Sequence, residues 1–286
     1  MASMRDIQRR KVSIESTGQI AKAMKLVSTV KLQKARGRAE SSKPYFSGMY
    51  NTVSAVLARS GNINHRFLQN HPDKKRAVIV ITSNRGLAGG YNSNIVKLLT
   101  KDEEFSSDKV VLYTVGRKGK DSLASNGYEV KKDYSDIIDE PLYSDAMNIS
   151  AELLRDFANG EIGEIYMAYT VFKNTVSHIP MMQKLLPVSV EDYELSEEEK
   201  LVPMNYEPGE EEVLDLIIPK YISSLIYGAL VEAVASENGA RMAAMDSATS
   251  NAEEMISELS LLYNRARQSS ITQELTEIIA GAEAID

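Results

Sequence analysis

The sequence predicts an α/β protein: a long antiparallel coiled coil of the N- and C-terminal helices, with a Rossmann-like βαβ domain inserted between them. Three observations predict it. Both ends of the chain carry long helical patterns, the two ends have opposite charge, and the middle alternates β-branched runs with helical segments. We therefore expect a long N-terminal helix over 1–59, an inserted domain with its connector over 60–209, and a long C-terminal helix over 210–286.

The N-terminal segment has a helical pattern from about residue 3 to residue 59, with possible irregularities at Gly18, Gly37 and Pro44. Apolar or small residues repeat every seven positions near its start and continue less regularly. The expected inner stripe comprises Ile7, Ile14, Ala21, Met24, Val27 and Val30. A seven-residue step is the period of a coiled coil.

The C-terminal segment shows the same period over a greater length. Alternating steps of three and four define a row of positions, which we call the seam, that should face a partner helix. The seam comprises Leu214, Ile217, Tyr221, Ser224, Gly228, Val231, Ala235, Asn238, Met242, Met245, Thr249, Ala252, Ile256, Leu259, Tyr263 and Ala266. From Asn238 onward it is rich in Ala, Met and Thr and has only one leucine, which predicts a close approach of two helices rather than a leucine zipper.

The charge of the two ends indicates which helices pair. Residues 1–38 hold ten lysines and arginines against two acids, a net charge of +8, and residues 210–286 have a net charge of −10. A basic amphipathic start alone is also typical of a nucleic-acid-binding coiled coil or of a protein at an anionic membrane surface. The acidic second helix and the lack of interleaved aromatic residues favour pairing within the chain.

The middle of the chain predicts a mostly parallel sheet. A strand is expected over 77–82 with a helix from about Asn92, the pattern repeats over 109–130, and another strand is expected over 165–172. Residues 183–190 should add an edge strand, and the acidic segment 191–209 should be a connector.

Helix lengths predict an unpartnered tip. At 1.5 Å per residue the first helix spans roughly 85 Å and the second roughly 110 Å, so the second should extend past the first by about 25 Å. The overhang, residues 269–286, carries Ile271, Leu275, Ile278 and Ile279. A soluble protein rarely exposes such a stripe, which predicts that another protein surrounds it.

No group of residues predicts catalysis, a cofactor or a metal site. The chain has no cysteine and three scattered histidines. The glycine-rich stretch Ser83–Asn94 matches neither the dinucleotide fingerprint nor the phosphate-binding P-loop, so a tight strand-to-helix turn explains it better than a ligand loop. The basic turn Gly116–Lys120 has the same interpretation. The charged start lacks the apolar core of a signal peptide, and no stretch reaches the apolar length of a membrane span.

Several motifs resemble one known family. They are "GQIAKAMKLV" (18–27), "ITSNRGLAGGYNSN" (81–94), "NYEP" (205–208), "SENGARMAAMDSATSNAEEMI" (236–256) and "YNRARQSSITQELTEIIAGAEAI" (263–285). In this order and over the whole chain they resemble the gamma subunits of F-type proton-translocating ATP synthases. Ala88 stands where many members have cysteine, and there is no cysteine-bearing insertion, so the resemblance implies no thiol regulation.

The resemblance implies a non-catalytic rotor shaft that couples proton-driven rotation of a ring of c subunits to the catalytic sites on the beta subunits. Its partners would be the hexameric head of alpha and beta subunits, the epsilon subunit and the c-ring, with no cofactor and no nucleic acid. The complex would lie at the cell membrane, with this chain peripheral on the cytoplasmic side. The implied head contacts are Met24, Arg267, Gln268, Ile271, Thr272, Gln273, Glu274, Leu275, Thr276, Glu277, Ile278 and Ile279. The implied contacts with the c-ring and epsilon are Tyr206 and Glu207.

Overall fold

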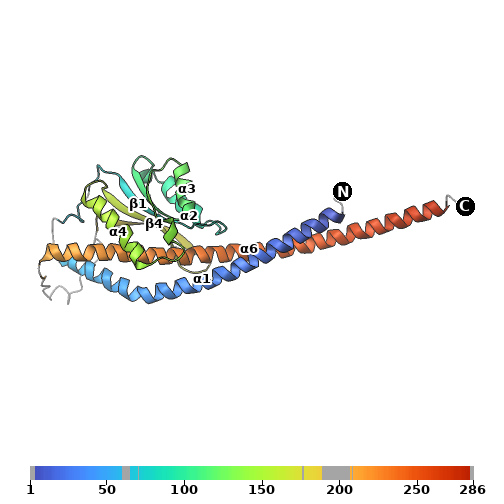
Figure 1. Cartoon of the computed structure of the whole chain (residues 1–286), viewed down its shortest axis with the longest axis horizontal. Helices are drawn as coiled ribbons and strands as arrows, with labels where there is room; N and C mark the ends of the chain where they lie inside the picture. The colour runs from blue at the N-terminus through green and yellow to red at the C-terminus, as the bar shows by residue number, and fades with distance from the viewer. Residues whose placement is uncertain are drawn as a thin grey trace. The chain divides into compact units, whose positions relative to one another are not determined.

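The computed structural model of the chain describes residues 4–59, 65–69, 71–175, 177–188, 207 and 209–283 (Figure 1). The chain divides into two compact units. One comprises residues 29–241, and the other comprises residues 1–28 together with 242–286. Two long helices, α1 (Met4–Arg59) and α6 (Glu210–Glu283), each contribute to both units. The predicted fold class, an α/β protein with long terminal helices, is confirmed.

The unit of residues 29–241 is built on one five-stranded sheet in the order β3-β2-β1-β4-β5. The strands are β1 (Arg76–Ile81), β2 (Val110–Val115), β3 (Val130–Asp133), β4 (Glu164–Phe172) and β5 (His178–Leu186). The first four run parallel, and β5 pairs antiparallel with β4 at one edge. The predicted mostly parallel sheet is confirmed, although the edge strand begins at His178, five residues before its expected start, and its expected last residues, 189 and 190, lie outside the described residues.

Helices cover both faces of this sheet (Figure 1). On one face, α2 (Tyr91–Thr100) and α3 (Arg117–Ser125) pack over Val78, Val80 and Leu112. On the other face, α4 (Tyr143–Ala158) and the 29–241 parts of α1 and α6 pack over Ile79, Ile81 and neighbouring strand residues. Two short 3-10 turns, η1 (Glu103–Phe105) and η2 (Ser135–Ile137), complete the unit. The central strands β1, β2 and β4 are buried over most of their length because both faces of the sheet are covered there, whereas the edge strands β3 and β5 are mostly exposed or half-buried.

Both terminal helices are continuous. The expected irregularities at Gly18, Gly37 and Pro44 do not interrupt α1, which runs as one helix from residue 4 to residue 59. Pro44 removes one backbone donor from the helix, and α1 remains helical through it. In α6 the predicted seam is confirmed, because every one of its positions is buried or half-buried.

The unit of residues 1–28 and 242–286 is an antiparallel helix pair. Lys25 contacts Asp246 through an ion pair, and Gly18 lies so close to Ala252 that a Cβ at position 18 would be 3.2 Å from the Ala252 Cβ. The small residues of the seam therefore permit the close approach that the sequence predicts. In these two contacts the residue numbers sum to 271 and 270, which fixes the antiparallel register.

The inner stripe of α1 differs from the expected one. Val27 and Val30 are exposed, and Ser28, Leu32 and Ala35 are buried instead. The observed stripe keeps alternating steps of four and three: Ile7, Lys11, Ile14, Gly18, Ala21, Lys25, Ser28, Leu32 and Ala35 are all buried or half-buried. The prediction was wrong at Val27 and Val30 because apolar character was followed in preference to the heptad period, which places a serine at the contact.

The first half of α6 is apolar enough to resemble a membrane-spanning segment by composition. Residues 211–280 contain one window long and apolar enough to cross a membrane by composition, contrary to the expectation from sequence. Half of that window is buried inside the protein. The fully buried Ile218, Ile222, Ile226 and Leu230 pack into the core beneath the sheet, and the core helix of a soluble protein passes the same test.

Candidate functional site

The candidate site is the part of α6 that extends past α1. Extrapolating the antiparallel register, Met4 at the described start of α1 lies opposite residue 266 or 267 of α6. Ser270 is half-buried, and residues 271–280 are all exposed. Figure 1 shows α6 continuing past the beginning of α1. The predicted overhang is therefore present.

The exposed tip has one apolar face. Ile271, Leu275, Ile278 and Ile279 are 48%, 54%, 69% and 60% exposed. Their spacing of four, seven and eight residues places them on one side of the helix. These side chains are large and follow one another along one side of the helix, and no described residue of the same unit covers them.

The polar residues of the tip fall into two groups. Thr272 and Thr276 donate their hydroxyls to the helix's own carbonyls four residues earlier, each at 2.8 Å, and Gln273 donates to Glu277 at 3.0 Å. Arg267 and Gln268 are exposed, and their side chains make no hydrogen bond or ion pair with any described residue. These two side chains are therefore available to a partner.

The other predicted contact residues lie elsewhere. Met24 is half-buried on α1 beside Lys25, which pairs with Asp246. About twenty residues of α6 separate that point from Arg267, roughly 30 Å along the helix, so the structure does not bring Met24 to the tip. Glu207 is exposed just before α6, whereas Tyr206 lies outside the described residues.

The glycine-rich stretch is a packed turn. Leu87 and Gly89 have positive φ angles of 62° and 55°, which reverse the chain between β1 and α2. The Ser83 amide donates to Asn92 Oδ1 at 2.9 Å, and the Ser83 hydroxyl donates to the Arg85 carbonyl at 2.6 Å. The Arg241 guanidinium of α6 approaches the loop from its carbonyl side, at 3.3–3.4 Å from the Arg85 and Gly86 oxygens. A loop that presents carbonyl oxygens to a cation is unsuited to hold phosphate.

Helix α6 also occupies the place where open α/β sheets bind ligands. In the order β3-β2-β1-β4-β5, strands β2 and β3 are added on one side of β1, and β4 and β5 are added on the other side. Folds with such a switch point bind ligands there, at the carboxyl ends of the strands. There the Ser236 hydroxyl donates to the Thr170 carbonyl at 3.0 Å, and Gly239 is pressed against Phe172 and His178. Sequence reasoning missed Ser236, Glu237 and Arg241 as contact residues. The available signal was an acid and a base one helical turn apart, Glu237 and Arg241, beside the seam positions Asn238 and Met242.

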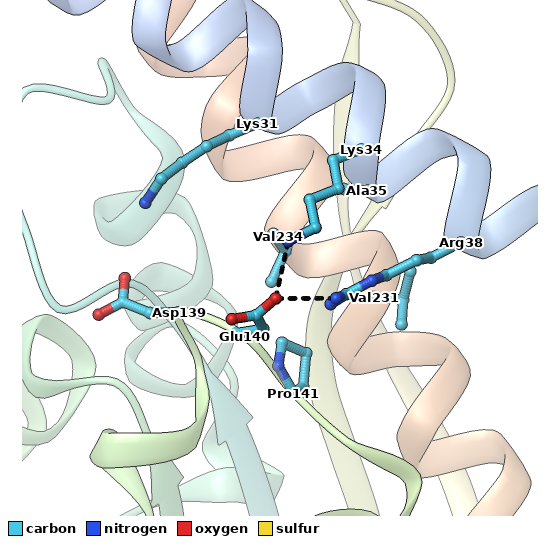
Figure 2. A pocket seen from close by; sticks show the side chains of 9 residues that line it. All are labelled: Lys31, Lys34, Ala35, Arg38, Asp139, Glu140, Pro141, Val231 and Val234. Carbon is cyan, nitrogen blue, oxygen red and sulfur yellow. Dashed lines mark hydrogen bonds and ion pairs between the residues drawn. The ribbon is translucent and has the colours of Figure 1, made fainter.

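A cleft of ≈ 230 Å³ lies between α1, α6 and the segment before α4 (Figure 2). Glu140 accepts from both Lys34 and Arg38 at 2.8 Å, with Ala35, Val231 and Val234 behind them. The hydrogen bonds from Lys34 and then Arg38 lower the pKa of Glu140. Lys34 and Arg38 both pair with Glu140, so this cluster joins α1 to the segment before α4.

The residues described by the structure contain no group of three or more His, Asp or Glu that could hold a metal ion. The fold and the site together define a class: an α/β protein whose long terminal helices pair, whose potential ligand crevice is filled by its own helix, and whose C-terminal helix ends in an exposed tip with one apolar face.

Comparison with known proteins identifies the member of this class. The ATP synthase family model matches residues 3–285. The ATP synthase gamma chain of Lachnoclostridium phytofermentans is 65% identical over the full length of both chains. The sodium ion specific gamma chain of Acetobacterium woodii is 43% identical over 99% of each chain. The chain belongs to the family of ATP synthase gamma chains, and in that family the gamma chain is a non-catalytic subunit.

Solved structures share the fold. A chain of the Euglena gracilis mitochondrial ATP synthase, from a structure of its OSCP/F1/c-ring part, matches with a TM-score of 0.69 and 18% identity, covering 99% of this chain and 94% of that one. A chain from the central stalk and c-ring of the Tetrahymena thermophila mitochondrial enzyme matches with a TM-score of 0.59 and 24% identity, covering 80% and 99%. The nucleic-acid alternative receives no support from these relatives.

Proposed function

We propose that this chain is the central rotor shaft of an F-type ATP synthase. In this proposal a head of alpha and beta subunits surrounds the paired helices, and epsilon and a c-ring hold the opposite end. Ion flow turns the ring and the shaft together, and the shaft drives the beta-subunit sites through ATP synthesis or hydrolysis. The family membership and the exposed apolar stripe of the α6 tip support this function.

The domain division follows the same proposal. Residues 1–59 and 210–286 act as the shaft, and residues 60–209 act as the inserted domain with its connector. The helix bounds of 4–59 and 210–283 support this division of labour. The compact units divide the chain differently, at residues 28 and 241, because parts of both shaft helices belong to the core of the sheet.

The tip residues have two proposed roles. Ile271, Leu275, Ile278 and Ile279 form the centred stripe held by an apolar collar of the head. Arg267 and Gln268, with Thr272, Gln273, Glu274, Thr276 and Glu277, face the head through polar contacts that change as the shaft turns. The lack of any described partner for the Arg267 and Gln268 side chains supports their part in this assignment. A solvent-screened ion pair contributes about 0–1 kcal/mol, so such contacts can be remade at each step.

Two further contacts complete the proposal. Met24 contacts an acidic segment of a beta subunit, and Tyr206 and Glu207 contact the c-ring and epsilon. The exposure of Glu207 just before α6 supports its accessibility. The complex places this chain at the cell membrane as a peripheral protein on the cytoplasmic side. The coupling ion is bound by the ring in this scheme, so the shaft role is the same for protons and for sodium ions.

The experiment that tests the function is assembly with the head. Leu275→Asp with Ile279→Asp is expected to impair assembly with alpha and beta subunits on native gels, because two charges would be buried in an apolar collar. The matched control is Leu142→Asp with Met147→Asp, two exposed apolar residues of the inserted unit that should leave assembly intact. A fully assembled and active double-Asp tip variant would contradict the proposal.

A further inference from the structure

We infer that Glu237 and Arg241 fasten the loop Ser83–Gly90 to α6, and that this contact, here called the clasp, makes the inserted domain and the shaft helix turn as one body. The clasp comprises these two side chains and the carbonyl groups of Arg85 and Gly86. The inference rests on the proposed shaft function, because only a rotating helix must resist twisting relative to its own domain.

The geometry of the clasp is that of a buried, partnered ion pair. Arg241 Nη2 lies 2.6 Å from Glu237 Oε1, one helical turn away, and the two side chains are only 9% and 10% exposed. The same guanidinium donates from Nη2 to the Arg85 oxygen at 3.4 Å, and from Nη2 and Nε to the Gly86 oxygen at 3.3 and 3.4 Å. One arginine thus joins α6 to two successive carbonyls of the loop.

The pair does not serve stability alone. Burial raises the pKa of Glu237, and the neighbouring Arg241 only partly opposes that rise. Apolar side chains of similar volume are often as stable or more stable in such a position. We take the contribution of the ion pair to be direction, because it joins one point of the α6 circumference to one loop.

Direction matters for a helix under torque. Apolar packing holds α6 against the domain, and hydrogen bonds at one point of the helix circumference add a directional contact that opposes rotation about the helix axis.

Neighbouring contacts explain why loss of the clasp should not unfold the unit. The Tyr91 hydroxyl donates to the Ala233 carbonyl at 3.2 Å, and the Ser236 hydroxyl donates to the Thr170 carbonyl at 3.0 Å. Further back, Ile222, Ile226 and Leu230 are completely buried in the core. These residues hold α6 in place when the loop is released.

The test uses the whole complex in liposomes and measures ions pumped per ATP hydrolysed. Arg241→Ala is expected to lower this ratio by about threefold or more, because a buried ion pair is broken and the loop loses its donor. Arg241→Lys should fall between wild type and Arg241→Ala, since an ammonium group cannot reach both carbonyls in the planar geometry of a guanidinium. Lys220→Ala, an exposed cation on the same helix, is the control and should pump as wild type does.

A charge-swapped variant separates the loop contact from the ion pair. Glu237→Arg with Arg241→Glu keeps opposite charges one turn apart but turns a carboxylate toward the Arg85 and Gly86 carbonyls. This double variant is expected to remain poorly coupled. Amide hydrogen exchange of residues 83–90 should accelerate by about tenfold or more in it and in Arg241→Ala, because the loop opens locally.

Three results would overturn the inference. They are wild-type pumping per ATP in Arg241→Ala despite faster loop exchange, restored coupling in the charge-swapped variant, and unchanged loop exchange in both. If Arg241→Ala fails to assemble, the charge-retaining Arg241→Lys and the nearly isosteric Glu237→Gln decide the matter, and normal coupling in both would reject the clasp. Failure of the shaft function itself gives a different result, since the wild-type chain would then support no ATP-driven pumping.

Discussion

Helix α6 buries its side chains to different depths along its length. In the 29–241 unit it buries Leu214, Ile218, Ile222, Ile226 and Leu230 completely, against the sheet and α4. In the other unit its most buried residues are Met245 and Ala252, and the facing positions of α1 include Gly18 and Ala21. One continuous helix is therefore held by a deep core at one end and by a shallow contact of small residues at the other.

The difference shows how the shaft divides its tasks. The part of α6 in the 29–241 unit, here called the deep half, buries most of the apolar surface of the helix. Each Å² removed from water contributes about 25 cal/mol, so this burial fixes the helix in its domain. The part of α6 from Met242 onward, here called the shallow half, buries little apolar surface and lies close to α1. The two helices form a slender pair that another protein can surround. The stability of the chain should then reside in the first half and its function in the second.

The sharpest way to break this comparison is a charge in the deep half. Ile222→Asp should destabilise the 29–241 unit by about 4 kcal/mol or more, because an unpaired carboxylate would enter a fully buried apolar site. Leu216→Asp, on the same helix but 63% exposed, should change stability by about 0.5 kcal/mol or less. Urea unfolding of the purified chain measures both. Equal effects of the two variants would mean that the core does not depend on this face of α6.

Sequence reasoning predicted the deep half and the shallow half unequally well. The sheet and its helices followed from β-branched runs and turns, and the heptad steps of α6 identified every seam position. The continuation of the α1 stripe failed at Val27 and Val30, since a helix pair needs small residues at close contacts and Ser28 meets that need. The start of β5 at His178 was also missed, because the segment 178–182 carries no alternating pattern strong enough to indicate an edge strand.

The candidate site shows the same limits. The exposed stripe from Ile271 to Ile279 could be predicted from helix lengths alone, because an unequal pair must leave one end uncovered. The contacts of Arg241 could not, since they depend on the loop after β1 folding back across the end of the sheet. Periodicity identifies which side of a helix is buried, and it does not identify which distant backbone carbonyls a buried cation will meet.

A bulky residue in the shallow half tests how tight the small-residue contact is. Gly18→Leu should destabilise the helix pair by about 1–3 kcal/mol, because its Cβ alone would lie 3.2 Å from the Ala252 Cβ. Gly37→Leu, on the same helix with open space around it, should stabilise helix formation by up to about 1 kcal/mol. Helical circular dichroism during thermal unfolding distinguishes them. A stabilising Gly18→Leu would show that the two helices can separate without loss.

Acid should lower the stability of the 29–241 unit through Glu164 at the start of β4. Burial alone would raise the pKa of Glu164, but hydrogen bonds from Lys184 and Arg76, both at 2.7 Å, lower it below its ordinary value. A carboxylate with a lowered folded pKa contributes stability above its unfolded pKa, and that contribution is lost as the pH falls through the folded value. Glu164→Gln should therefore cost on the order of 1 kcal/mol at pH 7 and flatten the loss of stability below about pH 4.5. Parallel acid profiles for the variant and wild type would contradict this role.

The smallest expected effect comes from locking the shallow half. The chain has no cysteine, so Gly18→Cys with Ala252→Cys introduces one defined pair. The two Cβ positions are 3.2 Å apart, slightly less than the separation of about 3.5–4.5 Å that a disulfide needs, so a small outward shift of the helices should allow the bond to form. If α1 and α6 turn as one body, as the close small-residue contact requires, oxidation should leave ATP turnover and pumping of the complex within about twofold of the reduced form. The bond is confirmed by mobility on a non-reducing gel, and activity is compared before and after reduction of the same sample. Loss of turnover that returns on reduction would show that the two helices move against each other during rotation, and that the shallow contact is a sliding surface rather than a fixed one.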